Sequence, residues 1–154
     1  MGAREFFESV RLAAMDADRT ARMLSEMESR EGVRAQSYGP RSTGGTCDPM
    51  RATDARIDRE AEWRQRIEHD YALIDEASEV IYGPGNEGGI AVLLGTPTAD
   101  AMWWRYCDAA SWDEVSKAVG YSVRSCLRMV EVAHDTIDSL GVGAVKAGDG
   151  GADW

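Results

Sequence analysis

The chain has 154 residues, of which 44% are hydrophobic and 29% charged, and its formal net charge at pH 7 is −10. This composition is typical of a soluble protein with one modest core, and no apolar run approaches the roughly 20 residues that a membrane-spanning helix requires. The acidic balance argues against a strong DNA-binding protein, because DNA-binding chains usually carry a basic footprint.

The cysteines and the N-terminus indicate a reducing cytoplasm. Cys47, Cys107 and Cys126 are too scattered for a CxxC metal pair and odd in number for a disulfide framework. The opening residues lack the apolar segment of a signal peptide. We therefore expect a cytoplasmic protein with no membrane association.

The first predicted element is one long helix from Ala3 to about Glu31, with Gly32 as its expected stop. Such a helix is about 40 Å long, too long to be covered by a small globule, and needs a partner helix from this chain or from a second copy. Its apolar stripe, at spacings of three and four, comprises Phe6, Phe7, Val10, Ala13, Ala14, Ala17, Ala21, Leu24 and Met27.

A Gly- and Pro-rich loop is predicted over residues 33–52, followed by a second long helix over residues 53–82. The second helix carries two seven-residue rows, as a coiled coil does. An antiparallel helical hairpin over residues 1–82 would bury both apolar stripes, and we expect the protein to form homo-oligomers through it. The two rows are Ile57, Arg64, Tyr71 and Ser78, and Glu60, Ile67, Ile74 and Ile81.

The outward face of the second helix is predicted to be acidic and is a candidate protein-binding surface. His69 lies among these acids, and a solvated histidine explains it better than a metal or acid–base site. The acidic residues are Asp58, Glu62, Glu68, Asp70, Asp75, Glu76 and Glu79.

Two segments are predicted to lack regular packing. Residues 83–96 contain several glycines and a proline and read as a linker or hinge, in which only the apolar run Ile90–Leu94 packs beneath the next helices. Residues 141–154 are rich in glycine and polar, and we expect a disordered tail.

Residues 97–140 have the pattern of a helix-turn-helix: a short helix, a glycine-containing turn and a longer helix. Gly120 is placed where the turn needs a positive φ angle, and Ser122 where the last helix needs an N-cap. Two adjacent tryptophans, Trp103 and Trp104, cannot both face inward. The inner stripe of the last helix is predicted to comprise Cys126, Met129, Val130, Ala133 and Ile137.

The candidate DNA-binding residues are Ser122, Arg124, Ser125 and Arg128. The two arginines stand four apart on the outer face of the last helix and are long enough to reach guanine edges or phosphates in a major groove. The alternative is a three-helix packing module in which these arginines only solvate a face, since Glu114, Glu131 and Asp135 lie nearby in the sequence.

The runs Met102–Tyr106, Trp112–Val115, Gly120–Ser122 and Arg124–Ser125 resemble the C-terminal part of ArpU-type phage and prophage proteins, which are similar to region 4 of sigma factors. The resemblance implies a phage transcriptional regulator that binds double-stranded DNA through its last helix, in the cytoplasm of a bacterial host. The chain departs from the pattern at Ala133–His134, where Ala-Leu is usual, and in the segment Gly83–Gly95.

No catalytic constellation, metal-ligand spacing or phosphate-binding loop is recognisable, so we expect neither an enzyme nor a cofactor or metal site. Two alternative functions remain open. One is an acidic phage protein that mimics nucleic acid and inhibits a host protein through the acidic helix. The other is a small DNA-packaging subunit that displays helix-turn-helix units on a ring.

Overall fold

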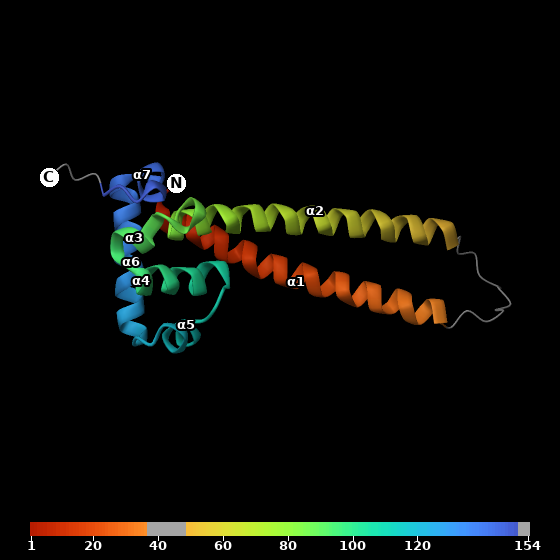
Figure 1. Cartoon of the computed structure of the whole chain (residues 1–154). Helices are drawn as coiled ribbons and strands as arrows, with labels where there is room; N and C mark the ends of the chain where they lie inside the picture. Colours follow the sequence, from red (N-terminus) through yellow and green to blue (C-terminus); the bar gives the residue numbers. More distant parts are fainter. Residues whose placement is uncertain (37–48, 151–154) are drawn as a thin grey trace.

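The computed structural model describes residues 1–36 and 49–150. Within these residues the chain is all-helical, as the sequence predicts, and contains no strand (Figure 1). The elements are α1 (Ala3–Gln36), α2 (Pro49–Tyr82), the 3₁₀ turn η1 (Pro84–Asn86), α3 (Gly89–Leu94), α4 (Thr96–Met102), the π-helical turn η2 (Trp103–Cys107), α5 (Trp112–Val119), α6 (Val123–Leu140) and α7 (Val142–Ala147).

Helices α1 and α2, which we call the arm, lie side by side and run in opposite directions (Figure 1). Each has 34 residues and is therefore about 51 Å long. One end of the arm is embedded in the remaining helices, and the other end projects away from them. Arg66 on α2 crosses to α1, where its guanidinium donates to Thr20 at 2.9 Å and pairs with Asp16 at 3.3 Å.

The helices of the arm extend further than predicted. Helix α1 continues through Gly32 to Gln36, and α2 begins at Pro49, so that both ends of the predicted loop 33–52 are helical. One glycine costs a helix only about 1 kcal/mol, and proline is well suited to the first helical position. The remainder of the predicted loop, together with Cys47, lies outside the described residues.

Only one of the two seven-residue rows of α2 faces the core. Ile81 is fully buried and Ile67 and Ile74 are half-buried, whereas Ile57 and Tyr71 of the other row are 58% and 51% exposed. Ile57 and Tyr71 of α2 therefore remain open to solvent.

The compact end of the molecule is built where α3 to α7 close around the first turns of α1 and the last turns of α2. Phe7 of α1 is fully buried there, with its ring 5.3 Å from that of Tyr106 on η2 and 5.6 Å from that of His134 on α6. The Tyr106 hydroxyl and His134 Nε2 lie 2.9 Å apart, within hydrogen-bond distance. Burial lowers the pKa of His134, which favours the neutral ring in this cluster.

The predicted linker over residues 83–96 is a packed segment. Gly83, Gly88 and Gly89 are buried, and α3 packs against α2, α4 and α7. A Cβ atom on Gly83, where φ is +80°, would lie 2.3 Å from the Gly88 nitrogen, and one on Gly88 would lie 2.2 Å from the Lys146 carbonyl oxygen. These glycines permit close backbone approach, which composition alone does not distinguish from flexibility.

The predicted disordered tail is helical over Val142–Ala147. Val145 of α7 is fully buried, and the Lys146 Nζ lies 3.5 Å from Glu79 Oε2 on α2. One buried valine and contacts with α2, α3 and α6 are enough to hold a six-residue helix that would not form alone. Residues 151–154 of the predicted tail lie outside the described residues.

Candidate nucleic-acid interface

Helix α5 is fixed at both ends by its own sequence. At its start, Ser111 and Glu114 form a reciprocal capping box, in which each side chain accepts a hydrogen bond from the backbone N–H of the other residue, at 3.3 and 3.2 Å. At its end, Gly120 adopts the left-handed conformation with φ +79°, as the sequence predicts. The chain is thereby turned sharply toward α6.

The turn between α5 and α6 is held by serine hydroxyls. Ser116 donates to the carbonyl oxygen of Tyr121 at 2.5 Å, which ties α5 to the turn. Ser122 is the N-cap of α6, as predicted, and its Oγ accepts from the backbone N–H of Ser125 at 3.2 Å. The Ser122 hydroxyl also lies 3.0 Å from Ser125 Oγ. Both predicted DNA-contacting serines are therefore already bonded to each other.

The inner face of α6 packs against α4, α5 and the start of α1. The predicted stripe is confirmed in most of its members, with Met129 half-buried and Cys126, Val130, Ala133 and Ile137 buried. His134, which the sequence leaves isolated, is buried as well through its contact with Tyr106. This partner lies 28 positions away in the chain, so that no local pattern indicates it.

Arg124 and Arg128 both lie on the outer face of α6 and are exposed. Neither forms an ion pair with any residue of the described part of the chain. Residues 115–130 contain three basic side chains and no acidic one, whereas the full chain carries ten more acidic than basic residues. The N-terminal half of α6 and the turn before it thus form a local basic patch.

The acidic residues predicted to weaken this patch are placed toward its margins. Glu114 is held in the capping box at the start of α5, which is the end of that helix away from the turn. Glu131 and Asp135 are exposed and belong to the C-terminal half of α6. The helix is therefore polarised, with its cationic half next to the turn and its anionic half beyond it.

Three further exposed residues lie in the same segment, residues 115–130. Lys117 lies in the last turn of α5, and Tyr121 and Leu127 are 46% and 45% exposed on the turn and on α6. An apolar side chain on a recognition surface makes contact with thymine methyl groups, and a tyrosine hydroxyl bonds phosphates. We call Lys117, Tyr121, Arg124, Leu127 and Arg128 the α6 patch.

Aromatic side chains of η2 and α5 pack against one another and position α5. The Arg105 guanidinium of η2 lies 4.5 Å from the centre of the Trp112 ring and donates to the Ala110 carbonyl oxygen at 3.1 Å. Trp103 is half-buried and Trp104 is 37% exposed, which confirms that the two tryptophans do not both face inward. Their rings meet edge to face at 5.3 Å, as expected for packing.

Replacing Ser122 by alanine is expected to lower the free energy of unfolding by about 1 kcal/mol, because the first turn of α6 loses its N-cap. Urea denaturation followed by circular dichroism measures the change. Ser139→Ala, an exposed serine near the other end of α6, is the matched control and should change stability by less than about 0.5 kcal/mol. Equal effects of both substitutions would contradict the capping role.

The predicted acidic face of α2 needs one correction. Asp70 is only 8% exposed and lies next to Asp16 of α1, and its Oδ2 is buried without a hydrogen-bond partner among the described residues. The other six residues of the predicted face are exposed, although Glu62 pairs with Arg59 and Glu79 with Lys146. Asp70 follows Trp63 by seven positions and precedes Ile74 by four, so the three side chains lie on the same side of α2, the side that faces α1. The sequence pattern had assigned Asp70 to the outward face instead.

The environment of Asp70 favours its protonated form. Burial and, after it, the neighbouring Asp16 raise the pKa of Asp70 to about 6, against the opposing effects of His69 and Arg66. The pKa of Asp16 is lowered, chiefly by the neighbouring Asp70 and then by Arg19 and Arg66. At mildly acidic pH Asp70 is therefore largely protonated, whereas Asp16 is ionised.

Protein stability is expected to fall between pH 5 and pH 8 by ~1.4 kcal/mol as Asp70 loses its proton. A carboxyl group whose folded pKa lies above its unfolded value stabilises the fold below the unfolded pKa, and this contribution disappears as the pH rises through the folded pKa. Asp70→Asn keeps a donor toward Asp16 and should remove most of this dependence. Urea denaturation at pH 5, 6.5 and 8 measures it, with exposed Asp58→Asn as control. A variant that retains the wild-type pH profile would exclude Asp70 as its source.

Among residues 1–36 and 49–150, no group of three or more histidine, cysteine or acidic side chains has the arrangement needed to hold a metal ion. None of the helices described is both long enough and apolar enough to cross a membrane. Comparisons of the chain with protein-family models, with curated proteins and with solved structures found no match. The assignment of a function therefore depends on the α6 patch itself.

Proposed function

We propose that the chain is a DNA-binding transcriptional regulator of the phage type that residues 102–137 resemble, and that α5, the turn and α6 act as a helix-turn-helix. The observation that carries the proposal is the pair of exposed, unpaired arginines on the first half of α6. A recognition helix meets base edges with its N-terminal residues, which is where Arg124 and Arg128 lie.

The contacts at the turn support a rigid recognition unit. Ser116, Gly120 and Ser122 fix the relation of α5 to α6 through side-chain hydrogen bonds and one left-handed residue. A pre-positioned helix loses little conformational entropy on binding, which favours affinity. The polarised charge of α6 further favours a pose in which Glu131 and Asp135 point away from the phosphates.

This function requires no catalytic group. The titratable side chains buried in the compact end are used in packing: Tyr106 and His134 bond each other, and burial raises the pKa of the Cys107 thiol to about 12. A thiol with such a pKa is a poor nucleophile. We propose that the protein acts by binding.

An enrichment experiment tests the proposal directly. The full chain is incubated with random-sequence duplex DNA at about 150 mM salt, and retained duplexes are sequenced over successive rounds. A DNA-binding regulator enriches a defined motif, with affinity in the range typical of specific complexes. The proposal would be rejected if no motif is enriched and the wild type binds duplex DNA no more tightly than the double variant Arg124→Ala, Arg128→Ala.

The acidic face of α2 provides the alternative, a surface that mimics nucleic acid and binds a host protein. Its exposed members Asp58, Glu68, Asp75 and Glu76 make no ion pair with a described residue. If the alternative is correct, charge reversal at Asp58 and Glu68 abolishes binding to that protein and leaves DNA enrichment unchanged.

A further inference from the structure

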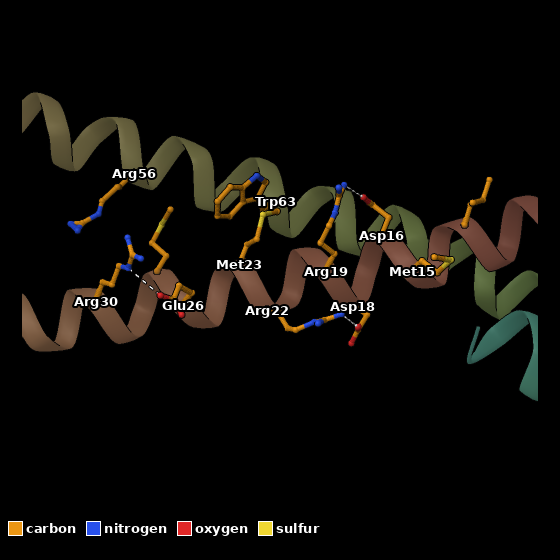
Figure 2. A pocket seen from close by; sticks show the side chains of 12 residues that line it. Met15, Asp16, Asp18, Arg19, Arg22, Met23, Glu26, Arg30, Arg56 and Trp63 are labelled. Carbon is orange, nitrogen blue, oxygen red and sulfur yellow. Dashed lines mark hydrogen bonds and ion pairs between the residues drawn. The ribbon is translucent and has the colours of Figure 1, made fainter. Parts of the chain in front are cut away.

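The arm contains a long groove between its two helices, with a volume of about 1110 Å³ (Figure 2). Figure 2 shows the Trp63 ring of α2 next to Met23 of α1, near the middle of the groove. Leu12 is 61% exposed and Met15 48% exposed, and Met23, Met27 and Trp63 are only half-buried. Burying one such side chain contributes about 1.5–3 kcal/mol, so the groove leaves a large apolar contribution unused.

Four charged residues of the groove alternate in sign at nearly equal distances on either side of Met23. Asp16 precedes Met23 by seven positions, and Arg30 follows it by seven. Arg19 precedes Met23 by four positions, and Glu26 follows it by three. A half-turn about an axis perpendicular to α1 at Met23 therefore brings each acid of this set opposite a base.

The other three charged residues of the groove are paired within the chain. Asp18 and Arg22 pair with each other on the side of α1 away from α2 (Figure 2). Arg56 of α2 lies 3.3 Å from Glu31 of α1. These pairs leave the alternating set around Met23 as the charge pattern that a partner meets.

We propose that the grooves of two copies face each other across a two-fold axis at Met23 and Trp63, so that the two arms lie antiparallel in a four-helix bundle. In this arrangement α1 of one copy lies along α1 of the other, and the same surface is used twice. The Trp63 and Met23 side chains of both copies meet at the axis. A buried aromatic anchor within a rim of charged residues is the usual composition of a specific interface.

Charge complementarity identifies a second copy as the occupant. Arg19 of each copy lies opposite Glu26 of the other, and Asp16 lies opposite Arg30. The same four residues already form exposed pairs within each helix, Arg19 with Asp16 and Arg30 with Glu26. Such pairs are worth at most about 1 kcal/mol, so little is lost when their partners are shared between copies.

Parallel arms would place like charges opposite each other at both ends of the groove. With the two-fold axis along the arm, α1 of one copy faces α2 of the other at the same height. Arg30 would then lie opposite Arg56, which contacts the residue next to Arg30, Glu31. At the other end Asp16 would lie opposite Asp70, its neighbour across the arm. The antiparallel arrangement avoids both contacts.

The mass of the full chain without DNA provides the first test. Sedimentation equilibrium at about 100 μM, well above a micromolar dissociation constant, should give twice 16.8 kDa. Arg19→Glu sets acid against acid and Glu26→Arg sets base against base, twice per dimer. Each variant should therefore raise the dissociation constant by roughly 100-fold or more. Both positions are exposed, so the helical circular dichroism of the wild type should be retained.

Arg64→Glu is the matched control for these variants. Arg64 is also an exposed arginine of the arm, and it pairs with Glu28 at 3.4 Å, but it does not line the groove. This variant should remain dimeric. A monomeric wild type, or groove variants that are as dimeric as the control, would overturn the proposal.

An exchange of charges tests the antiparallel pairing itself. Arg19→Glu and Glu26→Arg combined in one chain restore opposite charges at both contacts, and so does an equimolar mixture of the two single variants. The double variant and the mixture should both recover the dimer mass. Parallel arms predict no recovery, because positions 19 and 26 would then face α2 and not each other. Failure to recover the dimer would exclude antiparallel pairing of the grooves, whatever the outcome of DNA enrichment.

Discussion

Replacing Arg124 and Arg128 together by alanine is expected to weaken binding to the enriched duplex by roughly 100-fold or more. Each arginine that contacts a base edge or phosphate contributes about 1–3 kcal/mol, and the two side chains are exposed with no partner to release. The slope of log affinity against log salt should also decrease by about 0.9 for each phosphate that the variant no longer neutralises. Fluorescence anisotropy over a salt series measures both quantities.

Arg51→Ala with Arg59→Ala is the matched control for this experiment. It removes two exposed arginines from α2 and gives the same net charge of −12, but leaves the α6 patch unchanged. The control should bind within about threefold of wild type. If both double variants lose affinity equally, the effect is one of overall charge, and α6 has no special part in DNA binding.

Phe7→Ala is expected to lower the free energy of unfolding by about 3–5 kcal/mol. Phe7 is fully buried where α1 meets η2 and α6, and its ring contacts those of Tyr106 and His134. Truncation opens a cavity between three segments that are far apart in sequence and lets water reach the Tyr106–His134 hydrogen bond. Urea denaturation followed by circular dichroism and tryptophan fluorescence measures the loss.

Val132→Ala serves as the control for Phe7, because Val132 is 46% exposed on α6 and its truncation should cost less than about 0.5 kcal/mol. The Phe7 variant should retain its helical signal in native buffer while its urea midpoint falls. A decrease no larger than that of the control would show that the joint between the arm and the compact end does not depend on this ring.

The two predictions concern different parts of one arrangement. Phe7 fixes α6 to the arm from the inside, and Arg124 and Arg128 lie on the outside of the same helix. Loss of Phe7 should therefore reduce DNA affinity only at temperatures where the variant unfolds, whereas loss of the arginines should act at all temperatures. A temperature series of the binding assay separates the two effects.

The local features of this protein were determined by the sequence alone. The all-helical class, the N-cap at Ser122, the left-handed turn at Gly120 and the inner stripe of α6 follow from helical periodicity and from residues within four positions of one another. These features also locate the candidate site. Arg124 and Arg128 must be exposed because the opposite face of the same helix carries the buried stripe.

The tertiary structure decided between alternatives that local sequence patterns do not distinguish. Both seven-residue rows of α2 look alike in sequence, but only the row ending in Ile81 meets the core, and Asp70 turns inward to Asp16. The glycines of residues 83–96 and the short helix α7 are packed because Gly88 approaches the Lys146 carbonyl. His134 finds Tyr106 across the core. Each of these depends on contact between segments distant in the chain, and such contacts are fixed only when the whole core is assembled.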